Sequence, residues 1–281
     1  MNPAELQILA SRLTSIADEM GTVLRRAAYS PNIKERADCS AALFTASGEL
    51  LAQAEHIPVH LGSMPASVAA AIATGRRAPM VLNDPFSGGT HLNDITMVAP
   101  VVIDGRLVGW VANRAHHADV GGSAPGSMPP DALSIDEEGL RLPPTVLDDA
   151  VLARIVAASR TPAERGGDLD AQLGANLLGV ARFAELENFD GLAEILEHGE
   201  RRMRAALTAL PDGRWTFTDV LDSAGPRPGR VRLTSRGRRP GPGRQRLVAD
   251  LGQVHGGQGA GEPPAGVELA APAREAGRGR G

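Results

Sequence analysis

The segment that decides the fold runs from residue 91 to residue 122 and reads HLNDITMVAPVVIDGRLVGWVANRAHHADVGG. Two apolar, β-branched runs, residues 95–103 and 106–115, flank Asp104-Gly105, a dipeptide preferred in two-residue hairpin turns. The sequence therefore predicts an antiparallel hairpin. Its open end would carry three histidines and two aspartates, placed just before the first strand's apolar run or just after the second.

The turn predicts which residues of this hairpin lie opposite one another. Counted from Asp104-Gly105 without interruption, Asp94 lies opposite Ala115, and residues in opposite positions sit about 5 Å apart on one face. Strict alternation then places His117, rather than His116, on the face of Asp94. Strand ends often break alternation, so both histidines stay candidates for that face.

His91, Asp94 and one or both of His116 and His117 are thus expected to meet at one end of the hairpin. Two imidazoles and a carboxylate form a donor set that suits Zn, Mn, Fe or Ni and leaves positions open for water or substrate. Asp119 is a further candidate, as a ligand or as a partner that orients an imidazole. The alternative is that the histidine pair, which adjoins glycines, only holds a hydrogen-bonded loop.

The rest of residues 1–224 predicts an α+β fold. The first helix has Asn2 as N-cap, Pro3 at its first position and Glu5 to complete a capping box, followed by apolar residues at helical spacing. Further helices are predicted at residues 63–73, 148–159, 162–187 and 189–210. Strands are predicted at residues 40–45 and 49–52 around a Ser47-Gly48 turn, and at residues 215–220, where a further β-rich region begins.

The amino-acid composition and the hydrophobic pattern of the sequence change at about Gly225. Gly, Pro, Arg and Ala dominate residues 225–281, and neither a strand nor a helix period persists beyond residues 231–233. We therefore expect residues 1–224 to form the folded domain and residues 225–281 to be a disordered tail, because this composition offers little apolar surface to offset ordering entropy. A frameshift in the coding sequence is a second explanation of this biased composition.

Composition narrows the class of protein. Hydrophobic residues make up 42% of the chain and charged residues 22%, and the net charge of -4 gives no reason to expect nucleic acid or a membrane surface as partner. The single cysteine, Cys39, excludes an intrachain disulfide. Residues 1–30 lack the order of a signal peptide, and no apolar run reaches the roughly 20 residues that cross a bilayer. We expect a cytoplasmic protein.

Other polar residues give weaker signals. His56 and His60 lie four residues apart, but Pro58 argues against one helix presenting both, so they either line the same pocket or hold a loop. Gly88-Gly89 and Gly121-Gly122 could bring backbone amides close to an anionic ligand. Neither pair matches a phosphate-binding loop, and the sequence shows no dinucleotide fingerprint.

Four blocks of the sequence resemble the hydantoinase B/oxoprolinase family, and they occur in the family's order. The blocks are Glu35–Ser40 (ERADCS), Ile57–Met64 (IPVHLGSM), Asn83–Asp94 (NDPFSGGTHLND) and Asn113–Gly122 (NRAHHADVGG). The resemblance runs from the first helix to about Asp222. Family members continue with a large β-rich region that residues 225–281 do not resemble.

This resemblance implies a subunit of an ATP-dependent hydrolase that acts on a cyclic amide, a lactam or a hydantoin. It implies a hetero-oligomer with a hydantoinase A-like partner that uses the ATP, and a divalent metal (Mn or Zn) held by His91, Asp94 and His116. His117 or Asp119 would be the catalytic proton carrier. An acetone carboxylase-type subunit is an alternative with the same motifs, and a truncated, non-catalytic remnant is another.

Overall fold

The computed structural model describes residues 1–60, 62–186, 189, 191–209, 213–221, 229–237 and 248–252. The chain divides into two compact units, Met1–Leu196 and Glu197–Gly281. The first unit contains the candidate site and has the predicted α+β composition of helices and an antiparallel sheet.

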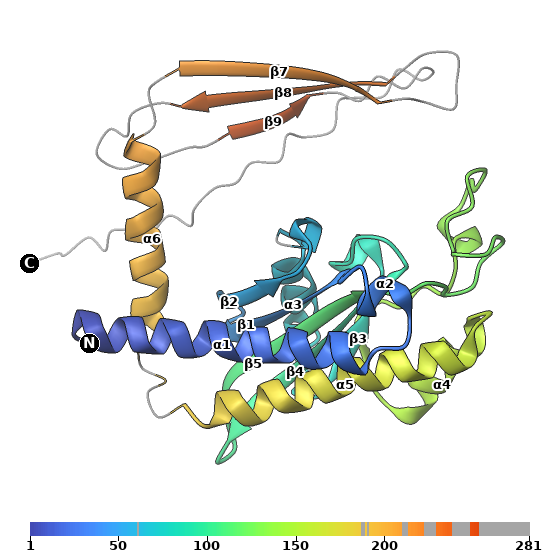
Figure 1. Cartoon of the computed structure of the whole chain (residues 1–281), viewed down its shortest axis with the longest axis horizontal. Coiled ribbons are helices and arrows are strands. Elements are labelled where there is room, and N and C mark those ends of the chain that lie inside the picture. The colour runs from blue at the N-terminus through green and yellow to red at the C-terminus, as the bar shows by residue number, and fades with distance from the viewer. Residues whose placement is uncertain are drawn as a thin grey trace, which may run out of the picture. The chain divides into compact units, whose positions relative to one another are not determined.

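A six-stranded antiparallel sheet, in the order β2-β1-β5-β4-β3-β6, forms the centre of the first unit (Figure 1). Its strands are β1 (Cys39–Thr45), β2 (Leu50–Glu55), β3 (Met80–Leu82), β4 (Asp94–Ile103), β5 (Arg106–His116) and β6 (Thr145–Val146). Both predicted hairpins are confirmed, and they join through β1 and β5. The sequence does not predict β3 and β6, because strands of 3 and 2 residues show no alternation.

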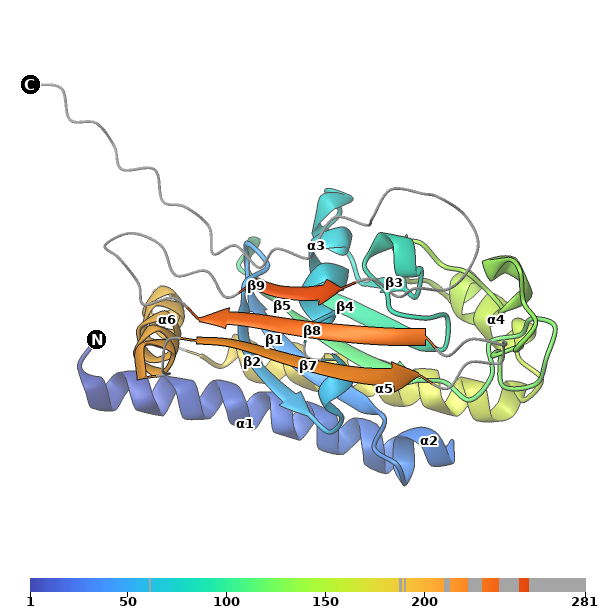
Figure 2. The ribbon, with the colours of Figure 1, turned by 90° about the horizontal axis from the view of Figure 1, so that it is seen from above.

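Helices cover both faces of this sheet. The long helices α1 (Pro3–Ala27) and α5 (Pro162–Ala184) lie side by side on one face, and α3 (Met64–Ala73) lies on the other (Figure 2). The remaining helices are α2 (Pro31–Lys34), α4 (Asp149–Ala158) and α6 (Leu192–Ala209). The predicted helices are confirmed, including the capping box of Asn2 and Glu5. None of the helices in the described part of the chain is long and apolar enough to span a membrane.

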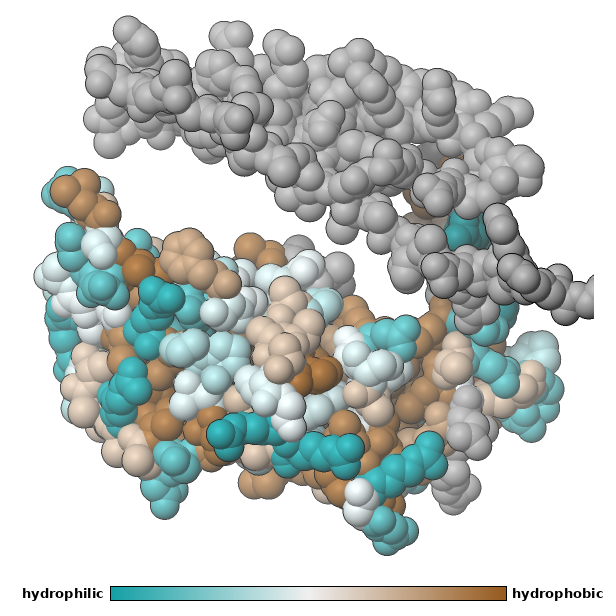
Figure 3. All heavy atoms as spheres, turned by 180° about the vertical axis from the view of Figure 1, so that it is seen from behind, coloured by the Kyte–Doolittle hydropathy of each residue, from teal (hydrophilic) through white to brown (hydrophobic). Residues whose placement is uncertain are grey.

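Neighbouring residues of the central strands face opposite layers of helix. One set packs with residues of α3 and consists of Ala42, Phe44, Val98, Trp110 and Ala112. The other set packs with α1 and α5 and includes Ala41, Leu43, Ala99 and Val111. Because both faces are covered, β1 is buried at every position. Figure 3 views the molecule from the α3 side, where hydrophobic and hydrophilic residues are intermixed on the described surface.

The predicted turn is present, but the register beyond it differs from the uninterrupted count. Asp104 and Gly105 both have positive φ, 49° and 77°, as a tight hairpin turn requires. A β-bulge follows the turn. Val101 of β4 pairs with Gly109 of β5, one residue later than predicted, so Val108 of β5 has no partner in β4. Glycine fits at 109 because an added Cβ would lie 2.6 Å from the carbonyl oxygen of Phe44. Every pair from the bulge to the open end is therefore shifted by one residue.

The second unit is described through its backbone strands β7 (Gly213–Leu221), β8 (Gly229–Gly237) and β9 (Val248–Gly252), which form an antiparallel sheet in that order. The strand predicted at residues 215–220 is confirmed as part of β7. However, β8 and β9 lie within the range expected to be disordered. β8 pairs with both β7 and β9 through backbone hydrogen bonds, which amino-acid composition does not predict. Residues 225–228, 238–247 and 253–281 lie outside the described residues, and for them disorder stays a prediction.

Candidate metal centre

Three adjacent strands carry polar residues at the same end of the sheet. β4 begins with Asp94, β5 ends with His116, and Asp38 precedes β1. Asp94 and His116 are direct partners, and the His116 amide donates to the carbonyl oxygen of Asp38 at 3.0 Å. The predicted pairing of Asp94 with Ala115 is wrong, because the bulge at Val108 advances β5 by one residue. Alternation therefore places His116, rather than His117, on the Asp94 face, which is the α3 face.

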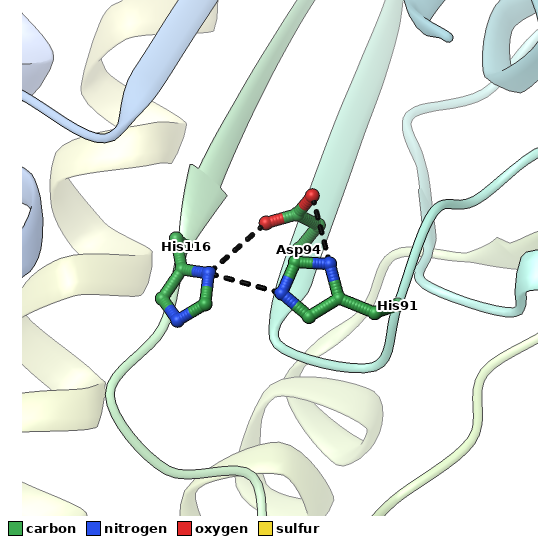
Figure 4. Close-up of side chains that lie close together, drawn as sticks. All are labelled: His91, Asp94 and His116. Carbon is green, nitrogen blue, oxygen red and sulfur yellow. Dashed lines mark hydrogen bonds and ion pairs between the residues drawn. The ribbon is translucent and has the colours of Figure 1, made fainter. Parts of the chain in front are cut away.

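His91, Asp94 and His116 converge in a compact cluster (Figure 4). His91 Nε2 lies 3.1 Å from His116 Nδ1, which lies 3.4 Å from Asp94 Oδ1, while His91 Nδ1 lies 3.2 Å from the other oxygen, Asp94 Oδ2. One ligand atom from each of the three residues lies within 4.8 Å of the other two. Two imidazoles and a carboxylate at this spacing form a donor set that could hold a divalent metal ion.

Asp94 provides a second observation that fits a bound cation. Its Oδ1 is buried and has no hydrogen-bond partner among the described residues, which is costly for a carboxylate oxygen unless a ligand completes it. Burial alone would raise the pKa of Asp94, but the adjacent imidazoles of His116, His60 and His91 hold that pKa well below its ordinary value. The buried carboxylate is therefore charged across the physiological pH range.

The three side chains differ in exposure. The Asp94 side chain is 2% exposed, that of His116 16% and that of His91 37%, so the cluster opens to solvent beside His91. The hydrogen bond with Asp94 raises the pKa of His91, although burial opposes this shift. His91 thus contacts the buried carboxylate of Asp94 on one side and solvent on the other.

His91 lies in the loop of residues 83–93, and Asn83 closes that loop at its base. The Asn83 side-chain amide donates to the carbonyl oxygens of Leu92 at 2.7 Å and Leu140 at 2.8 Å, and its oxygen accepts from the Leu142 amide at 2.7 Å. Position 88 favours glycine for two reasons: its φ is 94°, and a Cβ there would lie only 2.6 Å from the Ala66 carbonyl oxygen. Close packing of this loop on α3 therefore accounts for a glycine at position 88.

Asp38 and His60 approach the cluster from its other side. His60 Nε2 lies 3.5 Å from Asp94 Oδ2 and 3.7 Å from Asp38 Oδ1, while Asp38 Oδ2 lies 3.8 Å from His116 Nδ1. Of the two histidines whose place the sequence left open, His60 therefore lines the site. His56 does not; its ring lies against α1, where a Cβ at Gly21 would meet it at 2.4 Å. Sequence reasoning gave Asp38 no role, because nothing local predicts the β1–β5 pairing.

The structure does not bring His117 into the cluster. The His117 ring is fully buried towards α5, where Arg165 donates to Nδ1 at 2.6 Å and Gln172 Oε1 lies 2.8 Å from Nε2. Because the guanidinium can only donate, Nε2 must carry the proton. Burial, and then the charge of Arg165, lowers the pKa of His117 to about 3. The ring is a neutral, fully partnered part of the interior.

A stripe of buried polar residues on α5 continues this arrangement. Asp168 accepts from Arg165 at 2.9 Å, and its other oxygen accepts from the amides of Tyr29 and Ser30. Gln172 and Asn176 donate to the carbonyl oxygens of Ile95 and Met97 in β4. The sequence signal for this stripe is the recurrence of polar residues at steps of three and four in a helix: Arg165, Asp168, Gln172 and Asn176.

Asp119 also lies outside the cluster. Its Oδ1 accepts from the amides of Gly121 and Arg160, each at 3.0 Å, and its Oδ2 accepts from the Gly126 amide and the Arg160 guanidinium. Although burial opposes it, these hydrogen bonds lower the pKa of Asp119. Both carboxylate oxygens are therefore engaged in holding the loop that follows β5.

Comparison with known proteins relates the chain to one enzyme family. The family model of hydantoinase B/oxoprolinase matches residues 2–241. An uncharacterised protein of Methanocaldococcus jannaschii is 41% identical over 70% of this chain and 38% of its own length. The 5-oxoprolinase of Dictyostelium discoideum is 39% identical over 68% of this chain and 16% of its own length. The caprolactamase β subunit of Pseudomonas jessenii is 32% identical over 84% of this chain and 44% of its own length. The chain thus spans less than half the length of each of these relatives.

Two solved structures share the fold. The ATP-dependent caprolactamase of Pseudomonas jessenii superposes with a TM-score of 0.77 and 30% identity, over 85% of this chain and 45% of that one. A nucleotide-free acetone carboxylase superposes with a TM-score of 0.76 and 21% identity, over 85% of this chain and 36% of that one. At that lower identity the second likeness establishes the architecture alone.

Proposed function

The chain belongs to the hydantoinase B/oxoprolinase family, and on this basis we propose that it forms the metal-binding part of a subunit that hydrolyses a cyclic amide in an ATP-dependent enzyme. A hydantoinase A-like partner subunit would use the ATP, as the resemblance of the sequence blocks implies. The observation that carries the proposal is the convergence of His91, Asp94 and His116, with one buried carboxylate oxygen unpartnered among the described residues.

The relatives support a lactam as the substrate class. 5-Oxoproline and caprolactam are both cyclic amides, and the relatives named for them are 39% and 32% identical to this chain. The caprolactamase whose crystal structure resembles this fold is described as ATP-dependent. Acetone carboxylation stays the alternative, since the carboxylase structure, at 21% identity, shares only the architecture.

His91, Asp94 and His116 would hold a divalent ion, Mn or Zn, which would supply Lewis acidity towards an amide carbonyl. Asp94 provides the fixed negative charge, because its side chain is buried and ionised. His91 is the most exposed of the three and borders the open side, so a substrate would reach the ion beside this ligand. His116 closes the cluster from β5, at a position that the β-bulge determines.

For His117 and Asp119 we propose positioning roles in place of the expected proton transfer. Proton carriers need an accessible site for the proton, and both nitrogens of His117 are engaged in the interior. Asp119 accepts three backbone amides and a guanidinium. Together they hold the end of β5 and its following loop, and hence the backbone that carries His116.

Metal analysis tests the centre directly. Purified full-length protein should contain close to one equivalent of a divalent metal, and His91→Ala and Asp94→Ala should lose it while still folding. Equal metal content in all three proteins would remove the centre from the proposal. Removal of the metal with a chelator should abolish turnover, and re-addition of Mn or Zn should restore it.

Turnover tests the reaction class. With its hydantoinase A-like partner, the protein should open 5-oxoproline or caprolactam only when ATP is present. The Asp94→Ala protein provides the matched negative control, since it lacks the charge that the proposed centre requires. Product that forms only when bicarbonate is supplied would instead establish the carboxylase alternative.

A further inference from the structure

We propose that His60 is a positioning residue: a proton on its Nε2 faces the carboxylates of Asp94 and Asp38, attracts both, and so keeps Asp94 in the orientation that the cluster needs. The inference rests on the proposed metal centre and adds a residue to it. His60 is fully buried, and among the described residues its Nε2 has no partner within good hydrogen-bond geometry. That atom lies closest to two carboxylate oxygens, Asp94 Oδ2 at 3.5 Å and Asp38 Oδ1 at 3.7 Å.

The ring of His60 is anchored at the atom opposite to Nε2. Its Nδ1 lies 3.1 Å from the hydroxyl of Ser40, in the buried strand β1. The carbonyl oxygen of His60 accepts from the amide and the hydroxyl of Ser63, each at 3.2 Å. When the Ser40 hydroxyl donates to Nδ1, the remaining ring proton lies on Nε2 and faces the carboxylates.

The two oxygens of Asp94 have different partners, and this difference gives His60 its role. Oδ2 accepts from the Thr90 hydroxyl and lies 3.2 Å from His91 Nδ1 and 3.5 Å from His60 Nε2. Oδ1 has no hydrogen-bond partner among the described residues and lies nearest His116. Holding Oδ2 from behind therefore fixes the direction in which Oδ1 faces the proposed ion.

Charge makes this contact important for a second reason. Asp38 and Asp94 both approach His116, and two neighbouring carboxylates repel each other unless a donor or a cation lies between them. His60 Nε2 lies near an oxygen of each. Its proton attracts both groups before any metal is bound, so the cluster is shaped in advance for its ion.

A metal titration of full-length protein with Co(II), followed by visible absorption, tests the inference. His60→Leu removes the donor and should weaken Co(II) binding by about 10- to 100-fold. Substitution of a residue that orients a metal ligand typically has an effect of this size. His60→Gln keeps an N–H near the position of Nε2 and should recover most of that affinity. His56→Leu is the matched control, because His56 lies away from the cluster against α1, and it should bind Co(II) as the unmodified protein does.

The shape of the Co(II) spectrum separates positioning from ligation. At saturating Co(II), His60→Leu should show the same bands as the unmodified protein, because no ligand has been lost. Altered bands would make His60 a ligand and overturn the proposal, and so would unchanged affinity in His60→Leu. If the unmodified protein binds no Co(II), the metal centre itself fails. The role of His60 is then decided by nitrogen NMR of the metal-free protein, where a proton on Nε2 supports it and a bare Nε2 refutes it.

Discussion

His116 and His117 are neighbours in sequence, yet they belong to two polar regions on opposite faces of the sheet whose imidazole and carboxylate groups differ in how fully they are partnered. On the α3 face, His116 joins His91 and Asp94, and buried polar atoms there have no partner among the described residues. On the α5 face, both ring nitrogens of His117 are bonded to Arg165 and Gln172. The difference is clearest in the buried carboxylates: Asp94 keeps one oxygen without a hydrogen-bond partner among the described residues, whereas both oxygens of Asp168 are engaged.

The two regions should respond to mutation in opposite ways. Side chains of the α3-face cluster should control metal binding and contribute less to stability than those of the α5 network, because one buried oxygen of the cluster has no partner among the described residues. Side chains of the α5 network should control stability, because each removal leaves a buried polar group unsatisfied. Each of the following changes tests one side of this contrast.

The largest effect on stability is expected for Arg165→Met. Its removal leaves Asp168, fully buried, without its cationic partner, and losing one member of a buried ion pair costs about 3 to 5 kcal/mol. Urea unfolding of the metal-free protein measures this loss. A stability change below about 1 kcal/mol would show that the network contributes little to the fold.

Asp94→Asn should weaken divalent metal binding by more than about 100-fold, since it removes the buried charge and a ligand oxygen. Competition with a chelating dye measures the affinity. The urea midpoint of the metal-free protein should fall by less than in Arg165→Met, because the amide oxygen of asparagine can still accept from the Thr90 hydroxyl. A large stability loss with unchanged affinity would reverse the assignment of the two regions.

His117 and His91, one from each region, should also respond to pH with opposite signs. The pKa of His117 is lowered from 6.5 to about 3, so the unfolded chain binds a proton there that the folded chain does not. This group therefore lowers the free energy of unfolding as the pH falls from about 6.5 to 3, by at most about 1.4 kcal/mol per pH unit. The pKa of His91 is raised, so its contribution is present below about pH 6.5 and is lost as the pH rises through the folded pKa.

Urea unfolding of the metal-free protein at a series of pH values between about 4 and 8 would separate these contributions. His117→Gln should flatten the acid side of the stability profile, and His91→Gln should flatten the side above its unfolded pKa. A His117→Gln profile that retains the full acid slope would mean that His117 is protonated in the folded protein, contrary to its bond with Arg165.

The smallest effect is expected for a residue that belongs to neither region. Asn2→Ala removes the capping box of α1 and should cost about 1 kcal/mol in urea unfolding. Metal affinity should be unchanged, because the cap lies at the start of a scaffold helix. A change in affinity comparable to that of Asp94→Asn would show that stability and metal binding are not separable in this chain.

Sequence reasoning reached the turn and most elements, because Asp104-Gly105, the Asn2 cap and the apolar periods are local signals. It failed at the register, since the bulge at Val108 depends on packing between strands and helices. That single extra residue reverses which histidine faces Asp94. The family resemblance named His116, whereas the uninterrupted count favoured His117.

The parts that sequence reasoning missed depend on pairing between distant segments. Asp38 reaches the site because β1 lies beside β5, and no local pattern indicates that neighbour. The network on α5 was predictable in principle, from polar residues at helical spacing among alanines and glycines. Such a stripe is easily mistaken for a solvated face until the helix is known to cover a sheet.

The most direct test of the account compares the two adjacent histidines by metal titration. His116→Gln should weaken divalent metal binding by more than about 100-fold, while His117→Gln should stay within about 3-fold of the unmodified protein and lose stability instead. Strong loss of metal binding in His117→Gln, with His116→Gln unaffected, would contradict the register on which the proposed centre depends.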